Sequence, residues 1–205
     1  MAYVALSDRG QVISHPHSWV TKYVWSQDHK VIAIQYGIVA IAVGVVALIL
    51  SALMRLQLGF PDTFSIISPS EYYQFVTMHG MIMVIYLLTA LFLGGFGNYL
   101  IPLMIGARDM AFPKLNMYSF HAFNISGILV LMGFAAPLGA GSAGWTTYAP
   151  LSTNVGSFGW GQSLLVAGIF VTGVGTIMGG INYITTVIRL RAPGMTWMRL
   201  PLTVW

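Results

Sequence analysis

The chain has 205 residues, of which 57% are hydrophobic and only 7% are charged, and its formal net charge is +4. Soluble domains carry roughly 25% charged residues, so this composition excludes an ordinary soluble globular protein. Cysteine is absent, which excludes disulfides and thiolate-bound metal clusters. The small basic excess is explained by membrane topology, and we expect no nucleic-acid partner.

Apolar runs of about 20 residues recur along the chain, which is the length that crosses the core of a lipid bilayer. A polar segment over residues 1–24 precedes them, and we expect no signal peptide because the first run is too long and lacks a small-residue cleavage pattern. Four transmembrane spans are predicted, at 31–54, 71–106, 117–138 and 162–188, and a fifth begins at "PLTVW". Since the runs are continuous rather than alternating, the fold class is an all-α integral membrane protein.

The basic residues predict the orientation of these spans, because Lys and Arg gather in cytoplasmic loops. Eight of the nine lie on one side, namely Arg9, Lys22, Lys30, Arg108, Lys114, Arg189, Arg191 and Arg199. We therefore expect a multi-pass protein of the bacterial cytoplasmic membrane or the mitochondrial inner membrane, with its N-terminus on the cytoplasmic or matrix side. Arg55 is the exception, because it closes the first span on the outer side.

His79 lies within "FVTMHGMIM", about eight residues into the second span. At 1.5 Å per residue this is roughly 12 Å below the outer surface, where an ionisable side chain is costly and indicates function. Gly80 lets a flat group approach the helix, and Tyr72 lies two turns away on the same face. Two interpretations stay open: a neutral imidazole bonded to a carbonyl of a neighbouring helix, or an axial ligand of haem iron.

A second polar cluster lies at the cytoplasmic side of the bundle. Its members are Asn98, Asp109, Asn116, Ser119, Thr176 and Asn182. A capped interfacial loop with a surface ion pair between Arg108 and Asp109 is one interpretation. The other is a set of side chains that bind water inside three spans and carry protons inward from the carboxylate of Asp109.

Several segments together resemble subunit I of the haem–copper cytochrome oxidases of the aa3 type. They are "DHK", "LMRLQLGFP", "FVTMHG", "GGFGNYLIPLMIGARDMAFPKLN", "GWTTYAPL" and "GGINYITTVIRLRAPGM". Their order and spacing are kept from about residue 25 to residue 205. The resemblance implies that the chain is the N-terminal part of a bundle of about twelve helices, of which it holds the first four.

The resemblance also implies a haem site. The histidine of the "VT-x-HG" motif, here His79, corresponds to one axial ligand of the low-spin haem, a haem a. Arg55 corresponds to a residue that hydrogen-bonds a haem substituent, Tyr72 to a tyrosine near the same haem, and Trp145 to a tryptophan near the haem propionates. Gly80 adjoins this ligand.

A proton pathway is implied as well. Asp109 corresponds to the carboxylate at the entrance of a proton-uptake channel. Asn98, Asn116 and Asn182 correspond to its lining, and Tyr36 lies near the same path. Ser119 and Thr176 add hydroxyl groups.

Four positions depart from the family pattern. Gln57 stands where many relatives carry a glutamate, which puts an outer calcium or sodium site in doubt. Phe170 replaces a histidine that some members carry, and Gly175 replaces a serine of the proton path. His121 is unusual in the third span, and we favour a packed or interfacial role for it.

The implied activity is that of a proton-pumping cytochrome c oxidase that reduces oxygen to water. The high-spin haem, copper B and their ligands belong to helices beyond residue 205, so the segment alone is not expected to be active, whether the subunit is naturally split or the chain is partial. Expected partners are the remaining helices of subunit I, subunits II and III, cytochrome c or a quinol as electron donor, and the lipid bilayer. A quinol oxidase, a nitric oxide reductase relative and a haem-free bundle such as a transporter or assembly protein remain alternatives.

The second axial ligand of the low-spin haem is expected outside this segment. His15, His17 and His29 precede the first span, and His121 enters the third span from the same cytoplasmic side. His79 enters from the opposite side, so the vertical gap to His121 is on the order of 10 Å across a core about 30 Å thick. Two ligands of one iron must lie within about 4 Å of each other at Fe–N lengths near 2 Å.

Overall fold

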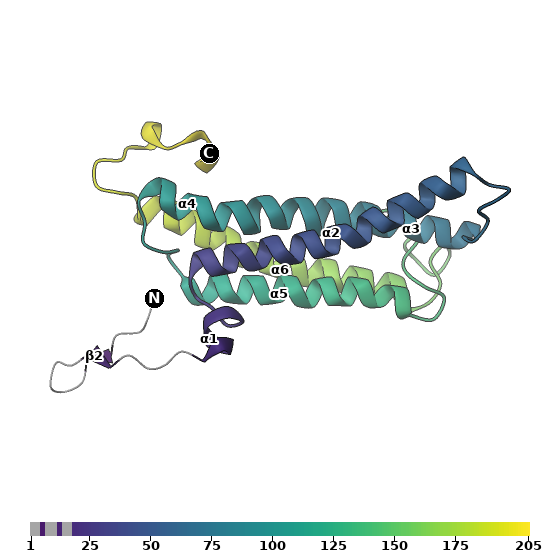
Figure 1. Cartoon of the computed structure of the whole chain (residues 1–205), viewed down its shortest axis with the longest axis horizontal. Helices are drawn as coiled ribbons and strands as arrows, with labels where there is room; N and C mark the ends of the chain where they lie inside the picture. Colours follow the sequence, from purple (N-terminus) through teal and green to yellow (C-terminus); the bar gives the residue numbers. More distant parts are fainter. Residues whose placement is uncertain (1–4, 7–11, 14–17) are drawn as a thin grey trace.

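The chain is described by a computed structural model, which covers residues 5–6, 12–13 and 18–205 (Figure 1). Much of the polar segment predicted over 1–24 therefore lies outside the described residues. Two short strands, β1 (Ala5–Leu6) and β2 (Val12–Ile13), pair antiparallel ahead of the bundle. Everything that follows is helical or irregular, and the predicted all-α membrane fold is confirmed.

Four helical segments are long and apolar enough to cross a membrane. A short helix, α1 (Trp19–Tyr23), precedes them. The segments are α2 (His29–Gly59); α3 (Pro69–Met81) with η1 (Ile82–Gly97) and α4 (Asn98–Ile105); α5 (Pro113–Met132) with η2 (Gly133–Ala135); and α6 (Trp160–Arg189). Two 3-10 turns follow, η3 (Trp197–Arg199) and η4 (Leu202–Val204), and η4 lies where a fifth span was predicted to begin.

Local sequence signals explain where these helices start and stop. The Asp28 side chain caps α2 by accepting the backbone N–H of Lys30. A capping box between Ser68 and Glu71 starts α3, with Pro69 in the first turn, so this helix begins two residues before the predicted range. Gly106 ends α4 with φ of 75°, a left-handed conformation that glycine adopts without strain.

The middle of the second span is a π-helix, η1, which spans 16 residues. A π-helix has wider turns than an α-helix and is found at functional sites. It presents Gly94, Gly95 and Gly97 to the interior, all of them buried. A Cβ at Gly94 would lie 2.5 Å from the ring of Tyr36 on α2, so the glycine is needed for the close approach of these helices.

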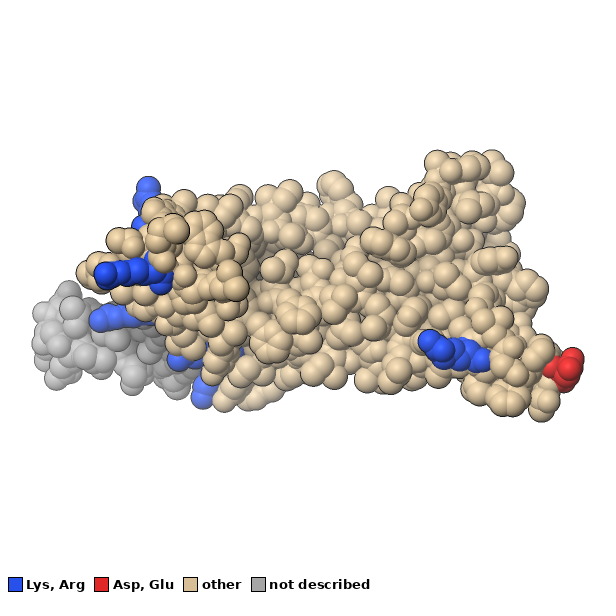
Figure 2. Space-filling model, turned by 90° about the horizontal axis from the view of Figure 1, so that it is seen from above, with Lys and Arg blue, Asp and Glu red and all other residues tan. Residues whose placement is uncertain are grey.

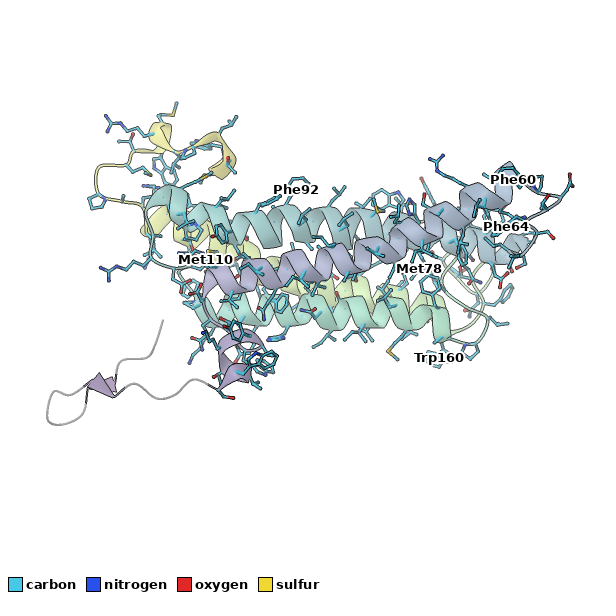
Figure 3. All side chains as sticks on the ribbon, in the orientation of Figure 1. Phe60, Phe64, Met78, Phe92, Met110 and Trp160 are labelled. Atoms are coloured by element: carbon cyan, nitrogen blue, oxygen red, sulfur yellow. The ribbon has the colours of Figure 1, made fainter. Side chains whose placement is uncertain are left out.

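The helices form a bundle in which α5 packs along α6, while α2 packs along η1 and also contacts α5 (Figure 1). Ile32, Tyr36, Met78, Tyr86 and Phe123 belong to the apolar core between them. Only 22% to 39% of the most apolar part of each span is buried, and side chains project outward all round the bundle (Figure 3). These outward faces are suited to lipid or to further helices.

Charge is segregated along the bundle. In Figure 2 the Lys and Arg side chains gather at one end, and a single basic side chain lies apart, toward the other end. Arg55 lies in the part of α2 remote from Lys30 and thus at the outer end. This asymmetry has the pattern of the positive-inside rule.

The long connection between η2 and α6 is tied to α3 by hydrogen bonds. The Gln74 amide donates to the carbonyl of Leu138 at 3.0 Å and accepts the N–H of Ala140 at 3.0 Å. The hydroxyl of Thr77 accepts the N–H of Gly144 at 2.9 Å. These bonds hold the following residue, Trp145, over α3.

Candidate functional site

His79 lies in the last turn of α3 and faces α2. Its Nδ1 atom lies 2.9 Å from the backbone carbonyl oxygen of Ala47. Because a carbonyl only accepts, Nδ1 carries the proton and Nε2 is left with its lone pair. A metal-ligating histidine is oriented in this way by its other ring nitrogen, so His79 fits an axial haem ligand. The carbonyl bond and iron ligation, first considered as alternatives, are therefore compatible.

Gly80 has a different neighbour from the one expected. A Cβ at this position would lie 3.1 Å from the Cβ of Trp145, so the glycine admits the tryptophan rather than leaving an open surface. Trp145 itself remains 48% exposed. Tyr72, two turns from His79, is partly buried and packs edge-on against Tyr73. Tyr72 thus lies on the same helix as His79, and Trp145 reaches that helix at Gly80 from the connection between η2 and α6.

The Arg55 side chain is exposed near the outer end of α2. Within the part of the chain that the structure describes, no hydrogen bond or ion pair holds its guanidinium. A guanidinium is permanently charged, so an acceptor near this apolar surface would bind it strongly.

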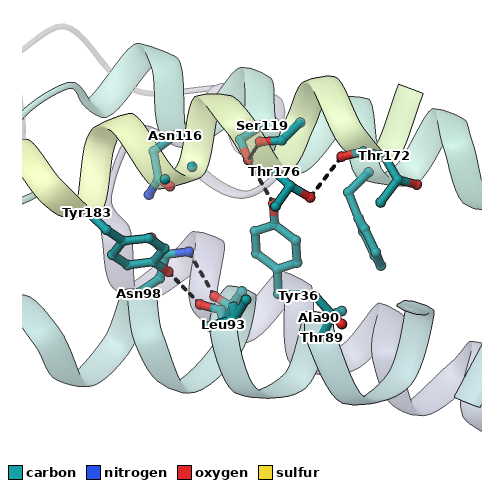
Figure 4. A pocket seen from close by; sticks show the side chains of 15 residues that line it. Tyr36, Thr89, Ala90, Leu93, Asn98, Asn116, Ser119, Thr172, Thr176 and Tyr183 are labelled. Carbon is teal, nitrogen blue, oxygen red and sulfur yellow. Dashed lines mark hydrogen bonds between the residues drawn. The ribbon is translucent and has the colours of Figure 1, made fainter. Parts of the chain in front are cut away.

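A cavity of about 230 Å³ lies between α2, η1, α5 and α6 (Figure 4). Its polar lining consists of Tyr36, Thr89, Asn98, Asn116, Ser119, Thr172, Thr176 and Tyr183. Five of the seven residues predicted for the proton pathway are thus brought together. A volume of this size holds several water molecules.

At this cavity, one side-chain amide atom of each of two asparagines is buried without a hydrogen-bond partner. The Nδ2 atom of Asn98 donates to the carbonyl of Gly94 at 2.8 Å, whereas its Oδ1 atom makes no hydrogen bond. The Nδ2 atom of Asn116 is also unpartnered, and each residue is only 2% exposed. Buried polar groups are nearly always satisfied, so an unpartnered acceptor and donor facing one cavity indicate bound water.

Hydroxyl groups continue the polar wall into the membrane. The Tyr36 hydroxyl lies 3.2 Å from the Ser119 hydroxyl, which donates to the carbonyl of Gly175 at 2.8 Å. Gly175 therefore contributes a backbone acceptor where relatives were expected to contribute a serine hydroxyl. Thr176 lies one residue further along α6 and also lines the cavity.

Asp109 lies outside the cavity, in the loop between α4 and α5. Its Oδ1 atom accepts the backbone N–H of Met110 at 2.7 Å. Partial burial raises the pKa of this carboxyl group above its ordinary value, and the hydrogen bond from the Met110 N–H opposes that rise. A carboxyl group with a raised pKa exchanges protons more readily near neutral pH.

Asn182 does not line this cavity and lies instead beside the loop that carries Asp109. It is fully buried, and its amide is occupied by Phe112: Oδ1 accepts the Phe112 N–H at 2.8 Å and Nδ2 donates to the Phe112 carbonyl at 3.1 Å. The Thr186 hydroxyl accepts the N–H of Ala111 at 2.9 Å. Asn182 thus fastens the loop that carries Asp109.

His29 was predicted only as a residue ahead of the first span, yet it is 1% exposed. Its Nδ1 atom lies 2.8 Å from the backbone carbonyl of Asn98, and its Nε2 atom is buried without a partner. It links the start of α2 to the start of α4 beside the Asp109 loop. No pattern in the sequence indicated this contact.

Thr172 and Tyr183 were also missed, although a signal was present. With Thr176 and Gly179 they recur at helical spacing, which places all four on one face of α6. Small and hydroxyl-bearing residues on one face of a transmembrane helix predict a polar interior surface.

His121 is packed on the cytoplasmic side of the bundle. Its ring centroid lies 4.1 Å from that of Trp25, just before α2 begins. The contact of His79 with Ala47, by contrast, lies about 27 Å further along α2 than His29, at 1.5 Å per residue. This separation supports a second haem ligand outside the segment.

Gln57 closes the outer loop by a long hydrogen bond. Its Oε1 atom accepts the N–H of Ile67 at 3.4 Å. No group of three or more His, Cys, Asp or Glu side chains that could hold a metal ion occurs among the described residues.

Comparison with known proteins completes this description. The alternative cytochrome c oxidase subunit 1 of Bradyrhizobium diazoefficiens is 58% identical over 193 residues, which are 93% of this chain and 33% of that protein. The probable cytochrome c oxidase subunit 1-alpha of Streptomyces avermitilis is 40% identical (93% of this chain, 32% of that protein), and the cytochrome c oxidase subunit 1 of Thermostichus vulcanus is 39% identical (93% and 34%). The chain spans about a third of the length of these relatives. The family model described as "Cytochrome C and Quinol oxidase polypeptide I" matches residues 31–205, and the chain therefore belongs to the haem–copper oxidase subunit I family.

Proposed function

We propose that this chain is the N-terminal part of the catalytic subunit of a proton-pumping terminal oxidase that reduces oxygen to water. The observation that carries the proposal is the cavity with unpartnered amides of Asn98 and Asn116, which lies near the loop of Asp109. Protons enter at Asp109 on the cytoplasmic or matrix side and move through water held by these amides. Tyr36, Ser119 and Thr176 continue the path inward.

His79 would hold the low-spin haem a through Nε2, while Nδ1 is bonded to the carbonyl of Ala47. Arg55 provides a positive charge for a substituent of that haem, and Tyr72 and Trp145 flank it. When bound, the haem supplies a one-electron iron centre. The second axial ligand, the high-spin haem and copper B belong to the remaining helices of subunit I.

The partners in this proposal are those remaining helices, subunits II and III, and cytochrome c or a quinol as donor. The membrane is the bacterial cytoplasmic or mitochondrial inner membrane. The positive charge around the helix ends at Lys30, Lys114 and Arg189 supports an N-terminus on the cytoplasmic or matrix side.

Replacement of Asp109 in the complete oxidase tests the proton-uptake role. Asp109→Asn should lower the rate of proton uptake and pumping while haem content stays unchanged, because the substitution removes the ionisable group alone. Asp62→Asn is the matched control, since Asp62 is an exposed carboxylate in the outer loop. Full pumping by Asp109→Asn would refute the assigned entrance.

A further inference from the structure

One face of α3 receives the connection between η2 and α6 in ordered steps. Gln74, Thr77 and Gly80 follow one another at three-residue spacing, so each lies about 4.5 Å further from the outer end of α3 than the one before it. Their partners follow in the same order, namely Leu138 and Ala140 at Gln74, Gly144 at Thr77, and Trp145 at Gly80. The connection therefore descends along α3.

Thr77 makes the middle contact, and its hydroxyl group is used in both directions. It donates to the carbonyl of Tyr73 at 2.8 Å and accepts the N–H of Gly144 at 2.9 Å. The residue is fully buried. Because the first bond fixes the side chain of Thr77 against its own helix, the second bond fixes the position of the Gly144 amide.

Gly144 is the residue that leads the chain into Trp145. Its φ is 80°, a left-handed conformation that glycine adopts without strain. Its N–H bonds Thr77, and its carbonyl accepts the N–H of Thr147 at 3.0 Å. The backbone just before Trp145 is therefore held on both sides of Gly144.

Trp145 contacts α3 at the residue that follows His79. A Cβ at Gly80 would lie 3.1 Å from the Cβ of Trp145 and 3.4 Å from its ring atom Cδ1. Successive residues of an α-helix differ by about 100° in direction and about 1.5 Å in height, so the indole lies near the level of His79 on an adjacent face. The heights of the indole and of the imidazole are thus set by the same helix.

We propose that Thr77 is a positioning residue, which fixes Trp145 relative to His79 through the amide of Gly144. Trp145 is 48% exposed, and its indole N–H is a hydrogen-bond donor with no acceptor capacity. Such a group suits a carboxylate. The consequence for the haem rests on the proposed function: with His79 as ligand, Thr77 sets where the indole N–H meets a carboxylate of the haem.

Thr77→Val in the complete oxidase tests this role, because valine keeps the shape of threonine and removes its oxygen. Thr185→Val is the matched control, since Thr185 also donates to a carbonyl four residues back, at 2.8 Å, but within its own helix. Hydrogen exchange at the Gly144 amide should become about tenfold faster in Thr77→Val, which corresponds to the loss of one hydrogen bond. Thr77→Ser should restore the protection, and Thr185→Val should match the unmodified protein.

The reduction potential of the low-spin haem shows whether Thr77 acts through Trp145. Thr77→Val and Trp145→Phe should shift this potential in the same direction, because both remove the placed indole N–H. The double variant should match Trp145→Phe alone, since changes at one shared contact do not add.

Additive shifts in the double variant, or equal exchange at Gly144 in Thr77→Val and Thr185→Val, would overturn the positioning role. The proposed function can fail separately. If exchange rises in Thr77→Val but Trp145→Phe leaves the potential unchanged, Thr77 still fixes Gly144, and it is the proposed place of Trp145 beside the haem that fails.

Discussion

The Nδ1 atom of His79 and the carbonyl oxygen of Ala47 lie 2.9 Å apart, and this bond joins α3 to α2 within the membrane. The acceptor is a backbone atom, so no substitution at residue 47 removes it directly. The ring plane of His79 is therefore set by the path of α2. The unprotonated Nε2 atom is thus held in one direction, which the proposed ligation of haem iron would require.

We expect His79→Leu to abolish the low-spin haem absorption band of the complete oxidase, because leucine has no lone pair for iron. His121→Leu is the control, since the ring of His121 packs at a tilt against Trp25. Its haem spectrum should match that of the unmodified protein. A normal low-spin band in purified His79→Leu would remove this residue from the haem site.

Arg55→Met should shift the absorption maximum and reduction potential of the same haem without releasing it. The reason is that, in the proposed site, the guanidinium would act as a charge and hydrogen-bond donor next to the haem, not as a ligand. Arg199→Met, at the opposite end of the bundle, serves as control. Arg55 would have no part in the site if both variants had identical spectra and potentials.

Protonation of Asp109 should occur at a higher pH than for an ordinary aspartate, because burial raises its pKa. The carboxyl stretch that disappears in Asp109→Asn gives the midpoint by infrared titration. A raised folded-state pKa means that ionisation destabilises the fold at high pH, and this penalty vanishes as the pH falls through the pKa.

The raised pKa of Asp109 also predicts a difference in thermal stability between the unmodified protein and Asp109→Asn. Asp109→Asn should unfold at a higher temperature than the unmodified protein at neutral pH, and the gain should shrink in acid. Asp62→Asn should show no comparable gain. If the infrared titration of the Asp109 carboxyl group has its midpoint at or below the usual pKa of aspartate, the burial of this group is contradicted.

Gly94→Ala should lower the stability of the bundle. A Cβ at Gly94 would lie 2.5 Å from the Tyr36 ring, and overpacking of this kind costs about 1–3 kcal/mol. At Gly37, on α2, a Cβ would meet nothing within 4 Å, so Gly37→Ala is the matched control. Thermal unfolding in detergent compares them, and equal melting temperatures would show that Tyr36 can move aside.

Local signals predicted much of the fold. Apolar length predicted four spans, and the Ser68 and Glu71 pair marks a helix start that follows from capping alone. The isolation of His79 in an apolar run indicated a functional position, and this stays a prediction. These features depend on neighbouring residues, which is why a single sequence reveals them.

The rest depends on contacts between distant segments. The bond of Asn182 to Phe112 requires the exact path of the loop before α5, and that of His29 to Asn98 joins two helix ends. Neither can be inferred from spacing within one helix. The π-helix η1 likewise has no signature in its composition, because the same residues suit an α-helix equally well.

The backbone N–H of Ala192 donates to the carbonyl of Ile105 at 2.8 Å, which ties the segment after α6 to the end of α4. Both partners of this bond and all four spans lie within the first 192 residues. The four spans can therefore pack against one another without a contact from any later helix. In this arrangement the imidazole of His79 is already held by Ala47.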